Sequence, residues 1–193
     1  MLDYIIVGSG LAGIAFAEVA QENNKSVVVF NDNSQNSSKI AGGLYNPVVL
    51  KRFTPVWQAE YQTQLASDFY KKLEQRLNII IDYKLPLLRK FYSAEEQNNW
   101  FIAADKPVLN SFISTKIVAN TIQYIPSIFG FGEVLHCGYV DVVLLLEKYR
   151  DELLKNNSYI DETFIYDDLQ IAEDFVQYKN TKAKQIIFAE GFG

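Results

Sequence analysis

Cysteine and histidine are almost absent from this chain of 193 residues, which has one of each, Cys137 and His136. A single cysteine excludes an intrachain disulfide, and one Cys with one His cannot supply the ligands of a Cys/His zinc site. We therefore expect no metal centre. So little cysteine also fits a reducing compartment, and the expected location is the cytoplasm.

Basic clusters and long hydrophobic runs are lacking as well. The chain has 18 Lys and Arg against 23 Asp and Glu, a net charge of −5, which predicts no direct nucleic-acid contact. The apolar stretch 4–20 follows Asp3 and is interrupted by three glycines and Glu18, so we expect neither a signal peptide nor a membrane span. With 49% hydrophobic and 21% charged residues, the composition is that of a globular domain.

The first 32 residues have the pattern of a β-α-β unit. Apolar runs at 4–7 and 27–30 predict strands buried in a parallel sheet, and the Ala-rich segment 11–21 predicts the helix between them. Further helices are predicted over 57–78, 94–103 and 142–154. Further strands are predicted over 84–92, 112–119, 121–125, 131–140, 159–166, 171–178 and 185–189.

This organisation predicts an α/β fold with two domains. The first is a Rossmann-like three-layer domain with a parallel sheet, built from both ends of the chain, residues 1–82 and 134–193. The second is an inserted β-rich α+β domain over residues 83–133, which we interpret as part of a substrate-binding domain.

The turn after the first predicted strand has the pattern of a dinucleotide-binding site. It has the pattern G-x-G-x-x-G, in which the first glycine permits the turn, the second admits a pyrophosphate and the third lets helix and strand pack closely. Its residues are Gly8, Ser9, Gly10, Leu11, Ala12 and Gly13. The diphosphate is expected at the helix N-terminus, where free N–H groups stabilise it.

The ribose of the dinucleotide is expected at the end of the second strand. An acidic residue usually stands there, about 20 residues beyond the glycine turn. Here the position is Asn31, followed by Asp32. Either the amide of Asn31 or the carboxylate of Asp32 is predicted to bind the ribose. The turn alone leaves the choice between FAD and NAD open.

Residues 37–47, Ser-Ser-Lys-Ile-Ala-Gly-Gly-Leu-Tyr-Asn-Pro, resemble the D-amino-acid oxidase / glycine oxidase superfamily, whose members have hydroxyl residues, small residues, an aromatic residue and a proline here. The resemblance implies FAD as the cofactor. It also implies that Ser37 and Ser38 contact the phosphates or ribityl chain of FAD. The flavin ring would be lined by four further residues, Ala41, Gly42, Gly43 and Leu44.

Two further segments resemble the same family. Thr163-Phe164-Ile165 is similar to the family's adenine-contacting strand, which implies a contact for Phe164. The segment Ala189-Glu190-Gly191 is similar to the small-x-Gly turn that lies over FAD. The resemblance spans nearly the whole chain, and Gly138–Asp141 is similar to the family's return from the substrate domain.

For the intact protein the resemblance implies FAD-dependent oxidation of the C–N bond of an amine or amino acid. Alternatives are an NAD-dependent dehydrogenase, a non-catalytic FAD-binding fragment, and a domain like the oxidoreductase part of tRNA-wobble-uridine-modifying enzymes. Family members are longer, so we interpret the chain as truncated, with its catalytic residues beyond Gly193. The 193-residue chain is then expected to show no oxidase activity. It is also expected to associate into a homo-oligomer through an aromatic-rich face of residues 84–140, or to be poorly ordered there, with six aromatic residues unpaired: Phe91, Tyr92, Trp100, Phe101, Phe112 and Tyr124.

Overall fold

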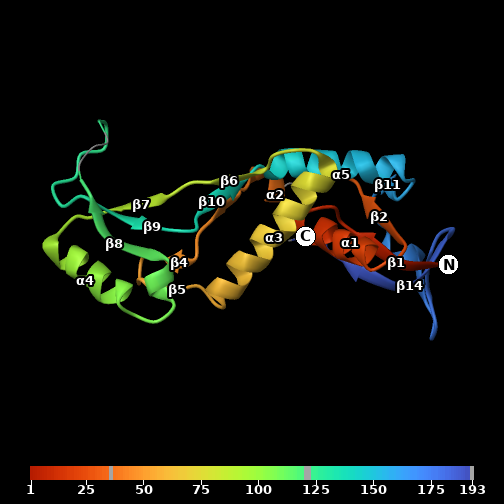
Figure 1. The fold of residues 1–193 in the computed structure, drawn as a ribbon. Helices are drawn as coiled ribbons and strands as arrows, with labels where there is room; N and C mark the ends of the chain where they lie inside the picture. The colour runs from red at the N-terminus through yellow and green to blue at the C-terminus, as the bar shows by residue number, and fades with distance from the viewer. Residues whose placement is uncertain (35–36, 120–122, 192–193) are drawn as a thin grey trace. The chain divides into compact units, whose positions relative to one another are not determined.

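The computed structural model describes residues 1–34, 37–119 and 123–191. The chain forms two compact units (Figure 1). The first unit combines Met1–Gly42 with Val142–Gly193, and the second is Gly43–Asp141. The two ends of the chain therefore fold together, as the sequence predicts.

The first unit is built on a six-stranded sheet of order β11-β2-β1-β14-β13-β12. Four of these strands are parallel: β1 (Leu2–Val7), β2 (Val27–Asn31), β11 (Tyr159–Asp161) and β14 (Thr181–Phe188). The other two, β12 (Leu169–Ile171) and β13 (Val176–Tyr178), continue the sheet as an antiparallel hairpin. Figure 1 shows β1 and β14 paired although they come from opposite ends of the chain. The predicted parallel sheet is confirmed.

Helices α1 (Leu11–Glu22) and α5 (Val142–Lys155) pack against each other in the first unit. The Tyr149 hydroxyl of α5 donates a hydrogen bond to the buried Glu18 carboxylate of α1 at 3.1 Å. Two short pieces complete the unit, α2 (Ser37–Ile40) and the 3-10 helix η2 (Tyr166–Asp168). The core of the sheet includes Ile5, Val7, Val28, Phe30, Val176 and Tyr178.

The second unit consists of small antiparallel sheets and two helices. Its helices are α3 (Ala59–Leu77) and α4 (Ala94–Ala104), with a 3-10 turn, η1 (Leu109–Ser111). One three-stranded sheet joins β3 (Leu44–Tyr45), β10 (Gly138–Val140) and β6 (Asp82–Lys84), and a second joins β7 (Leu87–Lys90), β9 (Phe131–Val134) and β8 (Ile113–Val118). A hairpin is formed by β4 (Val48–Val49) and β5 (Thr54–Pro55).

The compact units differ from the domain limits expected at residues 82 and 133. Residues 43–82 pack with the second unit, because Val48 and Ala59 are buried in the same core as Phe91, Trp100 and Phe112. Strand β10 also pairs with β3 and β6, which ties residues 138–140 to this unit. Which residues act as the cofactor domain and which as the substrate domain stays a prediction.

Several predicted strands are shorter than expected or divided. The strand expected over 84–92 is split into β6 and β7 around Pro86, which lacks the N–H that a strand ladder needs. The strand over 131–140 is split at His136, whose φ of +57° is not extended. The strand over 171–178 is the β12–β13 hairpin, and the one over 159–166 ends at Asp161. The strand expected over 121–125 lies partly outside the described residues.

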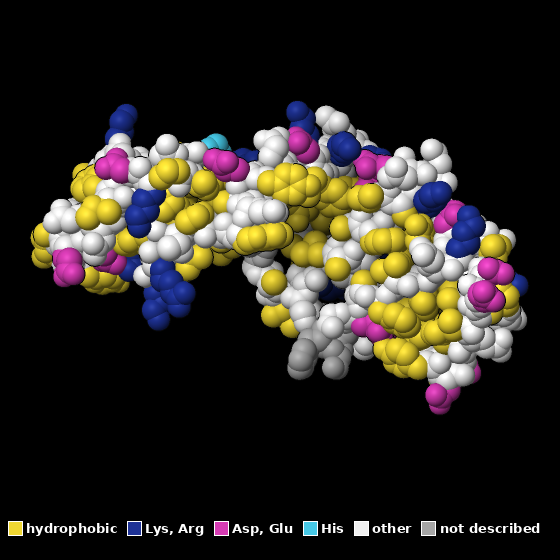
Figure 2. Space-filling view, turned by 90° about the horizontal axis from the view of Figure 1, so that it is seen from below, with side chains coloured by type: hydrophobic (Ala, Val, Ile, Leu, Met, Phe, Trp, Pro, Cys, Tyr) yellow, Lys and Arg dark blue, Asp and Glu magenta, His cyan; other side chains and the backbone are white. Residues whose placement is uncertain are grey.

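The expected aromatic face of residues 84–140 is partly wrong. Phe91, Trp100 and Phe112 are at most 3% exposed, because they form the core of the second unit. Tyr92 and Tyr124 are exposed as predicted, and Phe101 is partly exposed. Figure 2 shows hydrophobic side chains in separate patches among charged groups on the face that it draws. Within the described residues, no helix is both long and apolar enough to span a membrane.

Candidate functional site

A cavity of about 450 Å³ lies at the carboxyl ends of the parallel strands of the first unit. In open α/β sheets this edge is where ligands bind. Residues that follow β1, β2, β11 and β14 all contribute to the lining, together with α2 and the start of α1. The cavity is therefore built from four segments that are far apart in the sequence.

The glycine turn between β1 and α1 forms the floor of this cavity. Gly8 has a φ of +100°, and a Cβ there would overlap the carbonyl of Ala189, so only glycine fits. A Cβ on Gly10 would point toward Ser38 and lie 3.2 Å from its Oγ, in the space that the cavity occupies. Gly13 does not line the cavity but packs below it against the Gly8 carbonyl, in the helix-packing role predicted for the third glycine.

The N-terminus of α1 points its first amides at the cavity. The helical ladder starts with the bond from Ile14 N–H to the Gly10 carbonyl at 3.0 Å, so the amides of Leu11, Ala12 and Gly13 precede it. Leu11 N–H donates to Ser38 Oγ at 3.4 Å. Together with the helix dipole, such amides favour an anion, and the arrangement fits a diphosphate.

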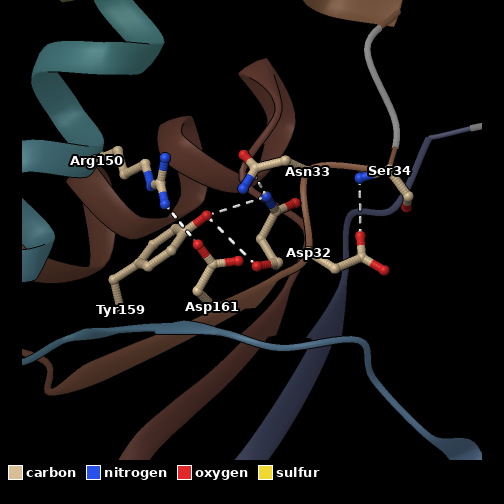
Figure 3. A network of polar contacts seen from close by, with 7 residues as sticks. Asp32, Asn33, Ser34, Arg150, Tyr159 and Asp161 are labelled. Carbon is tan, nitrogen blue, oxygen red and sulfur yellow. Dashed lines mark hydrogen bonds and ion pairs between the residues drawn. The ribbon is translucent and has the colours of Figure 1, made fainter.

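The Asn31 amide, at the end of β2, joins the glycine turn to strand β11. Its Oδ1 accepts from Ser9 N–H at 3.2 Å, and its Nδ2 donates to the Tyr159 hydroxyl at 3.1 Å and to Asn33 Oδ1 at 3.2 Å. Figure 3 shows Tyr159 directed at this group, with Arg150 and Asp161 paired beside it at 2.6 Å. Asn31 lines the cavity, but its amide is engaged within the protein.

Asp32 follows Asn31, and its carboxylate is hydrogen-bonded to the backbone two residues further on. Its Oδ1 accepts from Ser34 N–H at 2.9 Å (Figure 3). Hydrogen bonds from Ser34 and from the Thr163 side chain hold the pKa of Asp32 at about 2, so the group is ionised at neutral pH.

An aromatic group lies where the loop after β11 meets the end of β14. The Phe164 ring stacks on Tyr178 with centroids 4.2 Å apart, and the Phe188 ring meets its edge at 5.7 Å. Tyr166 stacks on Phe188, and its hydroxyl donates to the Glu190 carboxylate at 2.7 Å. Phe164 and Phe188 line the cavity, where they offer a surface for a planar ring.

Most of the predicted cofactor residues meet at this one cavity. Those in its lining are Gly8, Ser9, Gly10, Leu11, Ala12, Asn31, Asp32, Ser37, Ser38, Phe164, Ala189, Glu190 and Gly191. Ala41 and Gly42 are exposed and do not line it. Gly43 and Leu44 belong to the second unit, and Leu44 is 78% exposed.

Six residues of the lining were not predicted as cofactor contacts, although Thr163 belongs to the segment that resembles the adenine-contacting strand. They are Val7, Phe30, Ser34, Glu162, Thr163 and Phe188. Val7 and Phe30 end predicted strands, and Phe188 is the last residue but one of another. The rule that ligands bind at the carboxyl ends of parallel strands could therefore have found them. Glu162 and Thr163 follow β11, whose place beside β2 only the fold reveals. Among the described residues, no group of three or more His, Cys, Asp and Glu side chains could hold a metal ion.

Comparison with known families matches residues 3–74 to the FAD binding domain family. This segment contains the glycine turn, the N-terminus of α1, Asn31 and Ser38. This segment of the chain is therefore similar to an FAD-binding domain. FAD is thus the cofactor that the match and the cavity support, and the predicted Rossmann-like fold is confirmed.

Solved structures with this fold include glycine oxidase from Bacillus cereus, at a TM-score of 0.70 and 16% identity, covering 99% of this chain and 55% of that one. L-amino acid deaminase from Proteus vulgaris aligns at a TM-score of 0.65 and 15% identity, covering 99% of this chain and 47% of that one. L-α-glycerophosphate oxidase from Mycoplasma pneumoniae, solved with FAD bound, aligns at a TM-score of 0.61 and 14% identity. It covers 97% of this chain and 52% of that one. The predicted resemblance to the D-amino-acid oxidase / glycine oxidase superfamily is confirmed in the fold. The chain spans about half the length of these proteins.

Proposed function

We propose that the protein is an FAD-dependent oxidoreductase that acts on amino acids or related amines. The observation that carries this proposal is the 450 Å³ cavity, where the glycine turn and the N-terminus of α1 meet the ends of four parallel strands. The match of residues 3–74 supports FAD as its occupant. The names of two aligned proteins, glycine oxidase and L-amino acid deaminase, support amino acids as the substrate class.

The cavity residues would divide the work of holding FAD. The amides at the start of α1 and the Ser38 hydroxyl would bind the diphosphate, with Gly10 leaving the necessary space. Phe164 and Phe188 would contact the adenine, and Ala189 to Gly191 would lie over the cofactor. From the family resemblance, Ser37 would add a phosphate or ribityl contact, and the segment Ala41 to Leu44 would line the flavin ring.

Bound FAD would supply the acceptor for a hydride from the substrate carbon next to nitrogen. The described residues contribute to this reaction by binding and orientation. The α1 amides would neutralise part of the diphosphate charge, and the cavity would keep the adenosine part of the cofactor in one place. The catalytic residues are not assigned.

The cofactor proposal is tested by purifying the protein and recording its absorbance. We expect a yellow protein with flavin bands, from which heating releases FAD that mass spectrometry identifies. Isolation of NAD or FMN would contradict the proposal. Absence of any nucleotide, together with no binding of added FAD, would also contradict it.

The activity is tested separately by dye reduction and peroxide formation with a panel of amino acids and amines. We expect reduction of the bound flavin by at least one of these substrates. A protein that holds FAD but is reduced by none would contradict the oxidoreductase proposal, and would leave a non-catalytic FAD-binding chain.

A further inference from the structure

The ribose end of the cavity departs from the usual dinucleotide-binding pattern. In that pattern the side chain at the end of the second strand binds the ribose hydroxyls. Here that residue is Asn31, and both ends of its amide are engaged by Ser9, Tyr159 and Asn33. Asn31 therefore holds the glycine turn, and a ribose hydroxyl would have to share its Oδ1 with the Ser9 N–H.

Asp32, the next residue, is also engaged locally. Its carboxylate accepts hydrogen bonds from Ser34 and is bonded by the Thr163 side chain. These contacts direct the Asp32 carboxylate toward the residues that follow it in the chain. A ribose contact through Asp32 would have to compete with them.

Glu162 is the remaining acid beside this position. In the register of β11 and β2, Asp161 lies opposite Asn31, so Glu162 is level with Asp32 on the neighbouring strand. Its N–H donates to the Asn31 carbonyl at 3.3 Å. Adjacent strands are about 4.8 Å apart. Glu162 therefore lines the cavity one strand away from the usual position of the ribose-binding acid.

The Glu162 carboxylate is already oriented by two donors. The Tyr178 hydroxyl donates to Oε1 at 2.9 Å, and the Lys179 ammonium pairs with the same oxygen at 2.7 Å. A carboxylate has acceptor sites on two oxygens, so the group can still accept a bond from a ligand. The bonds from Lys179 and Tyr178 lower the pKa of Glu162, which keeps it ionised at neutral pH.

We propose that Glu162 accepts a hydrogen bond from a hydroxyl of the adenosine ribose, in place of the acid that usually ends the second strand. This inference rests on the proposed FAD site. Because the acceptor is an anion, the site also disfavours a nucleotide with a phosphate on that ribose.

The test is isothermal titration of the 193-residue chain with ADP, 2′-deoxy-ADP and 3′-deoxy-ADP, with FAD as reference. We expect the wild type to bind ADP about tenfold more tightly than at least one deoxy analogue, as a hydrogen bond to a charged group implies. Glu162→Ala should weaken ADP binding about tenfold and remove the preference for the hydroxyl. Glu162→Gln, which keeps a neutral acceptor, should lose less ADP affinity than Glu162→Ala does.

Two further variants make the result specific. Glu173→Ala removes an exposed acid outside the cavity and should leave ADP affinity and preference unchanged. If Asp32→Ala removes the preference while Glu162→Ala retains it, Asp32 is the acceptor and the inference is overturned. Binding of FAD and ADP that is insensitive to Glu162 overturns this inference alone. If the wild type binds neither, the proposed cofactor site fails as well.

Discussion

Single side chains decide how the nucleotide cavity is shaped. Asn31 is the clearest case, since its amide connects the glycine turn after β1 with Tyr159 of β11, which is 128 residues away in sequence. The residue at this position usually binds the ligand, whereas Asn31 holds neighbouring segments of the protein together. Gly10 has the opposite role, because it must contribute no side chain at all.

Replacing Gly10 by valine should therefore abolish tight cofactor binding without unfolding the chain. The new Cβ would stand 3.2 Å from Ser38 Oγ, and the two methyl groups beyond it would extend into the cavity. We expect FAD affinity to fall at least tenfold, or about 1.4 kcal/mol, in a flavin fluorescence titration. Ala66→Val, at an exposed position of α3, introduces the same side chain elsewhere and should bind as the wild type does. Unchanged binding by Gly10→Val would remove the glycine turn from the site.

Residues that act through their immediate sequence neighbours were predictable, and residues that act through the fold were not. The glycine turn could be identified because its pattern lies between a strand and a helix that the sequence itself predicts. The engagement of the Asn31 amide depends on Tyr159, and the position of Glu162 depends on β11 pairing with β2. No pattern near residue 31 or 162 encodes that pairing.

Among the elements, long segments with strong periodicity were predicted well and short strands poorly. The helix predicted over 142–154 is α5, and that over 94–103 is α4, because one apolar face or a cap marks each. The hairpin of β12 and β13 was merged into one strand because its turn around Asp174 contains neither Gly nor Pro. Strand β14 begins four residues before the predicted start, because Thr181 to Ala183 are paired with β13.

Helix α4 depends on its N-terminal cap. Ser93 Oγ accepts from Glu96 N–H at 3.1 Å, and the Glu96 carboxylate accepts from Tyr92 N–H at 2.9 Å. We expect Ser93→Ala to lower the free energy of unfolding by about 1 kcal/mol in urea denaturation. Ser93→Asp keeps an acceptor at the cap and should retain most of the stability. Equal loss in both variants would show that the cap hydrogen bond is not the cause.

Strands β1 and β14 are linked at their start by a charged contact that makes stability depend on pH. The Lys184 ammonium pairs with Asp3 at 2.7 Å, and Ser26 donates from its N–H and its hydroxyl at 2.9 Å each. These bonds hold the pKa of Asp3 well below its usual range. A carboxyl whose folded pKa is depressed stabilises the fold above its unfolded pKa of about 3.9 and loses that contribution as pH falls further.

Asp3→Asn should accordingly destabilise the chain at pH 7 and progressively less below about pH 4, where the unfolded wild type takes up a proton and the folded wild type does not. Urea denaturation of both proteins at pH 7, 5 and 3 measures the difference. Asp167→Asn, at an exposed aspartate of η2, is the control. A wild-type advantage that grows toward low pH would contradict the assignment.

At the scale of the whole molecule, the two compact units have separate cores. The thiol of Cys137 is buried in the core of the second unit, so its reactivity can be used to follow the unfolding of that unit. Cys137 is 3% exposed in the core that contains Trp100 and Phe112. Burial raises the pKa of its thiol to about 11. Since the thiolate is the reactive form, Cys137 should be inert in the folded chain at pH 8.

We expect a thiol reagent such as DTNB to label Cys137 only when the second unit unfolds. The labelled fraction should rise with urea along the same curve as the change in tryptophan fluorescence, because both tryptophans, Trp57 and Trp100, lie in the second unit. A protein denatured before mixing, which should be labelled completely, provides the control. Complete labelling within seconds in native buffer would contradict the buried position.

The pairing of β1 with β14 has a consequence for how the chain is made. Leu2 lies beside Ala183 in the sheet, so β1 finds this neighbour only after the chain has left the ribosome as far as β14. Until then the open edge of β1 is a target for chaperones or for the strand of another nascent chain. Ala189 N–H then donates to the Val7 carbonyl at 2.7 Å, beside the glycine turn. We therefore expect nucleotide capture only after β14 has been made, and contacts between residues so far apart in sequence should make spontaneous refolding slow.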